Sequence, residues 1–194
     1  MSISNLEGEI LLRHIEQYLG SPSRVWRHNA DGGDLPAQVL LFSHQPAEGT
    51  GCLLTFGLST HQLITRGGSP IRTELVICAR DSFDNRSIAA LLLSVASNAI
   101  ETHTFPGIHE VLVGKGPVLS NDSFEHFYLT YPGYFSKEFE VCSELTPPVT
   151  FSQLIPVSSS EYALLVQRGW KFLEAQFEAR EVDLLDFDRR AQVA

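Results

Sequence analysis

The sequence predicts an α+β fold, in which helices pack on a mixed, largely antiparallel sheet. Strand-like runs follow one another through most of the chain, and single helical patterns separate them. Glycine turns of the kind that join hairpins outnumber strand–helix–strand crossovers. Residues 151–177 join an apolar strand to a long amphipathic helical pattern, whose bulky stripe needs a sheet to cover it. These three features together indicate a layered α+β domain.

Length and composition indicate one domain over residues 1–194. The chain has 194 residues, of which 43% are hydrophobic and 19% charged, the balance of an ordinary globular protein. Its longest apolar run, Ile88–Leu93, is far shorter than the roughly 20 residues that span a bilayer. Glu7 and Glu9 occupy the place where a signal peptide would need basic residues. We therefore expect a cytoplasmic protein without a membrane segment.

The first element is expected to be a helix that ends at Gly20. Ser4 and Glu7 match the S-x-x-E capping box, and apolar residues then recur at helical spacing. His14 lies on the apolar side of this helix, and no second candidate metal ligand lies within one turn. We expect His14 to be a core or boundary residue.

Three strand-like runs follow the helix, and glycine turns separate them. The turns are residues 31–34 and 48–51, and the runs are Val25-Trp26 with their neighbours, Ala37–Phe42 and Cys52–Leu58. Glycines in these turns can adopt the positive φ that hairpin connections require. An antiparallel meander is the simplest topology for these runs.

Glu74 interrupts the fourth run, Ile71–Ala79, just before its most apolar part. If that strand is central, Glu74 must face solvent or find a partner, because an unpaired buried carboxylate is too costly to keep charged. Asp84 then caps a helix that ends before Phe105. Two further strands are predicted after it, at Phe124–Tyr131 and Phe139–Cys142.

The strand that begins at Phe151 contains Pro156, which has no N–H to donate to a central ladder, so the strand should lie at a sheet edge or end there. Ser158 and Glu161 form a second capping box. Replacing Glu161 by alanine should therefore cost about 0.5–2 kcal/mol and leave binding unchanged. The helical stripe beyond the cap consists of Tyr162, Leu165, Val166, Gly169, Trp170, Leu173 and Phe177.

The cysteines and the net charge bound the function. Cys52, Cys78 and Cys142 are odd in number and lie in apolar, strand-like contexts, so we expect buried free thiols. A net charge of −9 argues against a general nucleic-acid-binding surface. The same charge suits a basic protein partner, and it also suits solubility. No motif calls for a cofactor, and none is expected.

Ser59 is the one candidate nucleophile. Gly57-Leu58-Ser59-Thr60-His61 matches the first three positions of the G-x-S-x-G nucleophile elbow, but His61 replaces the second glycine. The residues after it do not predict the helix that the elbow requires. A small serine hydrolase that uses Ser59 and one of the histidines is therefore the least favoured hypothesis. Gly57 is expected to mark a close approach of backbone.

A metal site is not expected. His103, His109 and Glu110 are possible ligands, but a helical zinc pair needs a second histidine at the position that Val113 occupies. The sequence therefore predicts neither metal-binding nor catalytic residues.

Two further patterns lack essential residues. Residues 113–116, Val113-Gly114-Lys115-Gly116, do not have the spaced glycine or the Ser/Thr of a phosphate-binding loop. Asp183, Asp186 and Asp188 lack the glycine and the distal glutamate of a calcium loop, so a solvated face is expected. The apolar residues between these acids, Leu184, Leu185 and Phe187, should pack against the body of the protein.

An ordered set of short motifs resembles the Suppressor of fused domain in its small bacterial form. The resemblance covers about Val25 to Arg190. In order, the motifs are Thr55-Phe56-Gly57-Leu58-Ser59, Glu74-Leu75-Val76-Ile77, Leu91-Leu92, Tyr131-Pro132, Phe151-x-Gln153-Leu154-Ile155-Pro156-Val157 with Glu161, and Asp186-x-Asp188-Arg189.

The resemblance implies a mixed α/β domain with no known catalytic residues. The animal relative binds a transcription factor peptide as a strand between two domains, and bacterial members include immunity proteins that neutralise toxins. The resemblance thus implies a cytoplasmic protein-binding domain, most concretely an immunity protein for a basic toxin; an intracellular regulatory scaffold is the alternative. It assigns no partner-binding residues. An exposed strand edge is the expected place for a partner.

Overall fold

The computed structural model describes residues 5–28, 34–114 and 124–189. Its helices are α1 (Asn5–Leu19), α2 (Asn85–Thr102), α3 (Ser159–Arg168) and α4 (Trp170–Ala179), with short 3-10 helices η1 (Leu58–Thr60) and η2 (Lys137–Glu140). Its strands are β1 (Arg24–His28), β2 (Asp34–Ser43), β3 (Thr50–Phe56), β4 (Leu63–Ile64), β5 (Pro70–Ile71), β6 (Thr73–Arg80), β7 (Val111–Val113), β8 (His126–Thr130), β9 (Val141–Cys142) and β10 (Val149–Val157).

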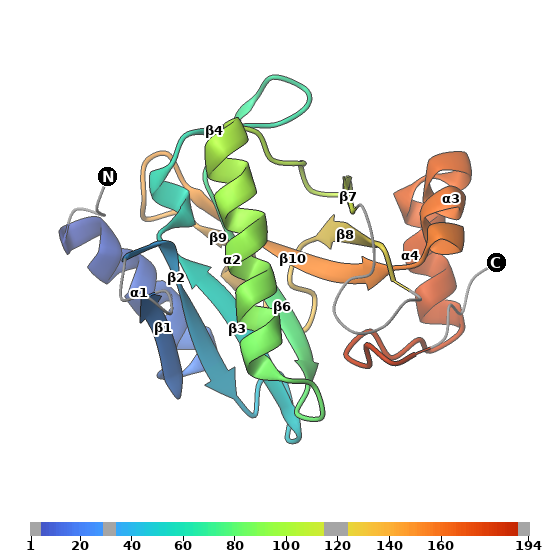
Figure 1. The fold of residues 1–194 in the computed structure, drawn as a ribbon, viewed down its shortest axis with the longest axis horizontal. Helices are drawn as coiled ribbons and strands as arrows, with labels where there is room; N and C mark the ends of the chain where they lie inside the picture. Colours follow the sequence, from blue (N-terminus) through green and yellow to red (C-terminus); the bar gives the residue numbers. More distant parts are fainter. Residues whose placement is uncertain (1–4, 29–33, 115–123, 190–194) are drawn as a thin grey trace.

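The main sheet has the order β1-β2-β3-β6-β10-β8-β7, and β9 pairs with β10 (Figure 1). Within the described chain, β6 and β10 form the single parallel pair of this sheet, and its other pairs are antiparallel. Strands β4 and β5 form a separate hairpin. The predicted α+β class is confirmed, as is the meander of the first three strands.

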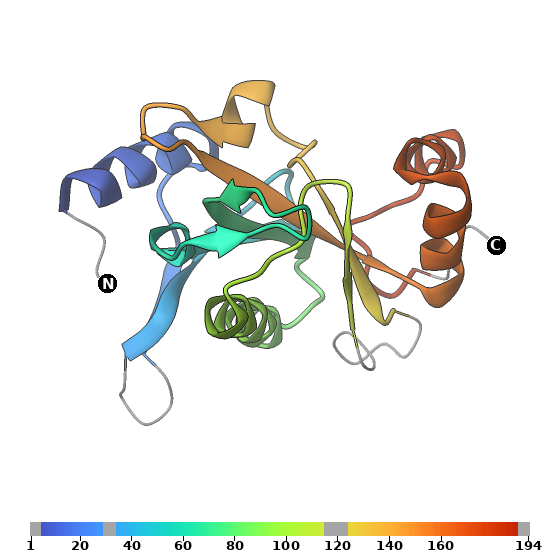
Figure 2. The ribbon, with the colours of Figure 1, turned by 90° about the horizontal axis from the view of Figure 1, so that it is seen from above.

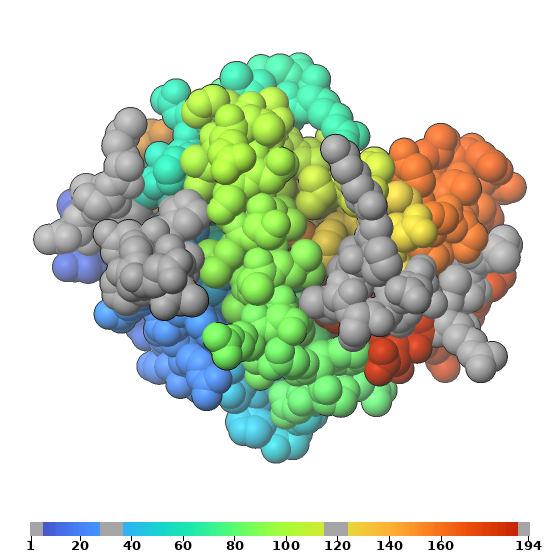
Figure 3. Space-filling view, viewed as in Figure 1, coloured from blue at the N-terminus to red at the C-terminus, as the bar shows by residue number. Residues whose placement is uncertain are grey.

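Both faces of the sheet are buried because helices cover each of them. Alternate residues of one strand point to opposite faces. Leu53 belongs to the core under α2, whereas its neighbour Cys52 belongs to the core under α1. Figure 2 shows α1 and α2 on opposite sides of the sheet, and Figure 3 shows α2 across the middle of one face. The prediction of buried thiols is confirmed for all three cysteines.

His14 is a core residue, as expected. It is buried in α1, and its Nε2 lies 3.3 Å from the carbonyl oxygen of Phe139. Its ring stacks on Phe151 with a centroid distance of 5.5 Å. The capping residue Ser4, the turn at residues 31–33, and Lys115 with Gly116 lie outside the described residues.

The amphipathic pattern after Glu161 forms two helices, so the prediction of one long helix is wrong. Gly169 lies between α3 and α4 with φ 85° and ψ 166°, a backbone conformation that a helix cannot contain. Its torsions are accessible to glycine at little cost. The break allows α4 to turn onto β8 and β10, with Leu173 and Phe177 buried against Tyr128 and Ile155.

The expectation that Pro156 marks an edge strand or a strand end is also wrong. Strand β10 is central and continues through Pro156 to Val157. Its pairing with β6 stops at Gln153, and beyond this residue β8 is its one pairing partner among the described strands. The carbonyl of Pro156 instead accepts a hydrogen bond from Arg189 Nη2 at 2.7 Å. Pro156 therefore lies beyond the last residue of β10 that pairs with β6, so its lack of an N–H removes no hydrogen bond between these two strands.

Glu161 has more partners than a cap requires. The capping box forms as predicted, with Ser158 N–H donating to Glu161 Oε2 at 2.9 Å. In addition, Arg189 Nη1 donates to Glu161 Oε1 at 3.1 Å, and both side chains are buried. The Arg189 guanidinium also lies 4.4 Å from the ring centroid of Phe124. Glu161 therefore ties the C-terminal segment to the start of α3.

The other differences concern short elements. Phe139 lies in η2 rather than in a strand, and β9 comprises only two residues. Strands β4, β5 and β7 were not predicted, because two or three residues carry no periodic signal. Within the described ranges, none of the helices combines the length and hydropathy that a membrane crossing requires.

Candidate functional site

The partial nucleophile motif surrounds a buried carboxylate. Glu74 on β6 is fully buried, and its carboxylate accepts five hydrogen bonds. The hydroxyls of Thr55 and Ser59 each donate at 2.7 Å, and the backbone N–H groups of Gly57, Leu58 and Ser59 donate at 2.9, 3.3 and 3.1 Å. Burial raises the pKa of the Glu74 carboxyl, and the hydrogen bonds oppose that rise. Glu74 is therefore buried with hydrogen-bond partners, which is one of the two alternatives expected for a carboxylate in this strand.

Ser59 holds this cluster together. Its side chain is 2% exposed, and its hydroxyl proton is directed at Glu74 rather than at an imidazole. Strand β4 follows η1, and the helix of a nucleophile elbow is missing from this part of the described chain. Gly57 has φ 112°, a torsion that glycine adopts at little cost, and the expected close approach of backbone stays a prediction. The local geometry gives Ser59 a structural role.

The histidines and acids of the candidate metal sites are separated. His103 ends α2 with φ 54°, whereas His109 stacks on Trp170 at a centroid distance of 3.6 Å. Glu110 accepts a hydrogen bond from Gly107 N–H at 3.0 Å. Across residues 5–28, 34–114 and 124–189, no three His, Cys, Asp or Glu residues are placed to hold a metal ion.

The acids of the C-terminal segment support its fold. Asp183 pairs with Arg80 on β6, and Asp186 Oδ1 accepts a hydrogen bond from Asp188 N–H at 2.9 Å. The apolar residues between these acids contact the body, as predicted. Leu184, Leu185 and Phe187 join three different hydrophobic clusters. The segment therefore packs against the end of the sheet where β6 and β10 stop pairing.

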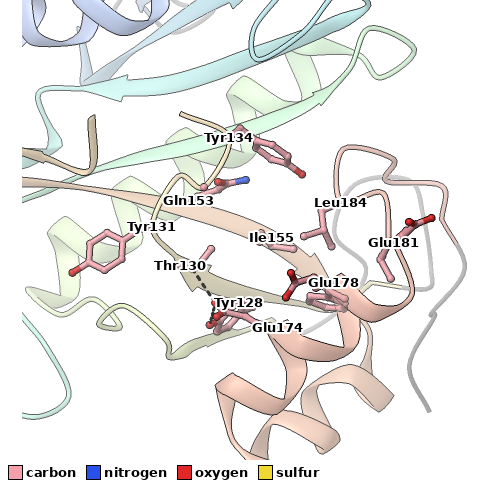
Figure 4. Close-up of a pocket in the computed structure, with 13 residues that line it drawn as sticks. Tyr128, Thr130, Tyr131, Tyr134, Gln153, Ile155, Glu174, Glu178, Glu181 and Leu184 are labelled. Atoms are coloured by element: carbon pink, nitrogen blue, oxygen red, sulfur yellow. Dashed lines mark hydrogen bonds between the residues drawn. The ribbon is translucent and has the colours of Figure 1, made fainter. Parts of the chain in front are cut away.

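A groove of about 490 Å³ lies on the sheet face that carries α4. Strands β8 and β10 form its floor, and α4 with the segments that follow β8 and α4 forms its walls (Figure 4). Its described lining contains three glutamates and no lysine, arginine or histidine. The lining residues are Tyr128, Thr130, Tyr131, Gly133, Tyr134, Gln153, Ile155, Glu174, Phe177, Glu178, Glu181, Val182 and Leu184. The groove is thus aromatic and acidic.

A hydrogen-bonded chain fixes Glu174 at the groove. Tyr128 donates to Glu174 Oε1 at 2.7 Å, and Thr130 Oγ1 donates to the same oxygen at 3.2 Å. Burial and the nearby Glu174 raise the pKa of Tyr128, so its hydroxyl remains protonated. His109 Nδ1 lies 2.9 Å from that hydroxyl, and burial lowers the pKa of His109. A neutral His109 with its proton on Nδ1 completes the chain.

The sequence contained a signal for this groove, a series of glutamates, but the prediction for this segment rested on its apolar residues. Glu174, Glu178 and Glu181 are spaced i, i+4 and i+7, beside the buried Leu173 and Phe177. Glu174 and Glu178 lie on one side of α4, whereas Glu181 follows the end of the helix with φ 51°. The contribution of β8 and β10 could not be read locally, because those strands meet α4 only through the tertiary fold. The predicted strand edges exist at β1 and β7, and partner binding there stays a prediction.

A profile of the family described as Suppressor of fused protein (SUFU) matches residues 33–190. The chain belongs to this family. It is 24% identical to Immunity protein YqcF of Bacillus subtilis (strain 168), over 96% of this chain and 97% of the relative. The family resemblance inferred from the ordered motifs is therefore confirmed.

Solved structures support the fold. A putative SUFU homolog from Neisseria gonorrhoeae has a TM-score of 0.71 at 19% identity, over 96% of this chain and 97% of that one. A chain of the Sufu–Fu complex has a TM-score of 0.68 at 12% identity, over 99% of this chain and 93% of that one. At these identities the likeness establishes a shared fold.

Proposed function

We propose that this chain is a non-catalytic, cytoplasmic protein-binding domain of the immunity type, which neutralises a partner toxin by binding it. The observation that carries the proposal is the relationship to Immunity protein YqcF, which extends over nearly the whole of both chains. Membership of the Suppressor of fused family agrees with it.

The chemistry of the described residues supports a binding role. The hydroxyl of Ser59 is directed at Glu74, and the groove beside α4 has an acidic lining. A net charge of −9 favours a basic partner. Charge complementarity acts mainly on the association rate, which falls as salt screens the charges.

The proposal is tested by capture of the tagged chain from cells that carry its gene, at low and at moderate salt, followed by mass spectrometry. We expect one stoichiometric basic protein, with less captured as salt rises. An unrelated protein of the same net charge is the control for capture by charge alone.

The captured partner is then expressed alone and together with this chain in a naive host. The partner alone should arrest growth, and co-expression should restore it. A stoichiometric partner that is harmless alone would replace immunity by the scaffold alternative. The absence of any partner at both salt concentrations would overturn the binding role itself.

A further inference from the structure

The groove beside α4 contains polar groups that the protein leaves without partners. Gln153 on β10 is only 3% exposed and lines the groove, yet among the described residues its carboxamide makes no hydrogen bond. Because no buried side-chain nitrogen or oxygen of the described residues lacks a partner, the amide atoms of Gln153 must be open to the groove, where their hydrogen-bonding capacity is free. Figure 4 shows the Gln153 carboxamide beside Tyr134 at the groove. A ligand that enters the groove can supply a donor and an acceptor.

The acids of the groove also keep carboxylate oxygens without a partner in the described chain. Glu178 and Glu181 are exposed, and neither side chain forms a hydrogen bond or ion pair within the described part of the chain. Glu174 uses Oε1 for both of its hydroxyl partners, and its Oε2 accepts no hydrogen bond from the described residues. Three glutamates therefore line one groove whose described lining has no positive charge. A cation is the ligand that balances them.

The walls of the groove fit a guanidinium better than a metal ion or an ammonium. Tyr134 presents an aromatic ring at the groove, on which a planar guanidinium stacks (Figure 4). Ile155 and Leu184 offer apolar surface for the stem of a long side chain. Because alternate residues of β10 face the same side, Gln153 and Ile155 lie along one floor. The groove thus combines an amide, apolar surface and carboxylates in its lining.

We propose that the groove binds an arginine-bearing segment of a protein partner. The guanidinium pairs with Glu174 and Glu178, its stem packs on Ile155 and Leu184, and the Gln153 carboxamide bonds to the segment's backbone. Charge complementarity and the unpartnered amide of the largely buried Gln153, which opens to the groove, select this occupant. The inference rests on the proposed binding function and adds to it a location and a recognised side chain.

The test uses the whole chain, labelled with ¹⁵N, and the peptide acetyl-Gly-Arg-Gly-amide. The same peptide with citrulline in place of arginine keeps the shape and removes the charge. A ligand of this size should bind with a dissociation constant of about 1 mM. We expect the arginine peptide to change the NMR chemical shifts of backbone amides around Tyr131, Gln153 and Glu174. The citrulline peptide should bind at least about tenfold more weakly, because it loses one ion pair with its hydrogen bonds.

Two variants and a control locate the interaction. Glu174→Gln keeps the Oε1 acceptor for Tyr128 and Thr130, and should weaken arginine binding about tenfold while citrulline binding stays unchanged. Gln153→Met keeps the volume and removes the amide, and should weaken both peptides. Glu101→Gln, on α2 across the sheet, makes the same charge change as Glu174→Gln and should alter neither affinity.

The proposal is overturned if the shifts map elsewhere, if the peptides fail to saturate the chain, or if arginine and citrulline bind equally. A lysine peptide that binds as tightly as the arginine peptide would overturn the assignment to guanidinium. None of these outcomes affects the immunity proposal, which depends on partner capture. Failure of capture, in turn, leaves the peptide titration to stand by itself.

Discussion

Two sets of carboxylates in this protein differ in whether the chain supplies their partners. Glu74 and Glu161 are fully buried, and each of their carboxylate oxygens accepts at least one hydrogen bond from the chain. At the groove, Glu178 and Glu181 have no such partner in the described structure, and the amide of Gln153, which is open to the groove, has none either. Residues whose partners lie within the chain hold the fold, whereas those without partners are available to another molecule.

The largest effect is expected at Glu74. Glu74→Ala leaves three buried N–H groups and two hydroxyls without their acceptor, and should cost at least about 4 kcal/mol of unfolding free energy. Glu74→Gln retains one acceptor oxygen and should cost less. Urea unfolding followed by circular dichroism measures both variants. A cost below about 1 kcal/mol for the alanine variant would show that water replaces the carboxylate.

The next effect concerns the buried pair of Glu161 and Arg189. Glu161→Ala should cost about 3–5 kcal/mol, because it leaves a buried guanidinium without its charge partner. Ser158→Ala removes the cap alone and should cost about 0.5–2 kcal/mol. The same unfolding assay compares the two. Equal costs would restore the earlier interpretation of Glu161 as a cap.

A smaller effect is the pH dependence that Glu74 introduces. Its pKa is raised by burial, so the folded state keeps the proton to a higher pH than the unfolded chain does, whose value is about 4.3. Between the two pKa values the folded state binds more protons, and stability falls as pH rises. The stability of the wild type relative to Glu74→Gln should decrease from below pH ~4 upward and then level off. A difference that is constant with pH contradicts the raised pKa.

Ser59→Ala removes one of the five donors to Glu74 and should cost about 1 kcal/mol. Partner capture and peptide binding should not change, because Ser59 is buried away from the groove lining. The wild type should also resist labelling by a fluorophosphonate probe. Labelling at Ser59 would revive the hydrolase hypothesis.

The smallest effect on stability is expected at Gln153. Because its amide lacks a partner among the described residues, Gln153→Met should keep the unfolding free energy within about 0.5 kcal/mol of the wild type or raise it. Thermal and urea unfolding measure this change. A loss of 2 kcal/mol or more would mean that the amide has a structural partner, and that the groove lacks its unpaired polar group.

Much of the fold could be predicted because the patterns that specify it are local. The caps at Asp84 and Ser158 form as expected, since a cap depends on three or four neighbouring residues. The break at Gly169 was missed because apolar spacing continues across it, and only the torsions of that glycine interrupt the helix. Pro156 was misplaced because its tolerance depends on where a neighbouring strand stops pairing.

The groove could be predicted only in part. The spacing of Glu174, Glu178 and Glu181 is visible in the sequence, but nothing local shows that Glu178 and Glu181 have no partner in the described chain. For Ser59 the sequence suggested a role that the structure does not support. The motif around it resembles part of a nucleophile elbow, whereas in the structure its hydroxyl donates to the buried carboxylate of Glu74. In both cases, partners distant in the sequence decide the role.

By itself the sequence determined the fold class, the family and the positions of most elements, because hydrophobic periodicity, capping and turn chemistry act over a few residues. The tertiary structure alone decided which carboxylates receive hydrogen-bond or ion-pair partners from the chain. Glu74 meets Thr55 across neighbouring strands, and Glu161 meets Arg189 across 28 residues. Hydrogen bonding and charge pairing act at contact distance, so they depend on where the fold brings side chains together.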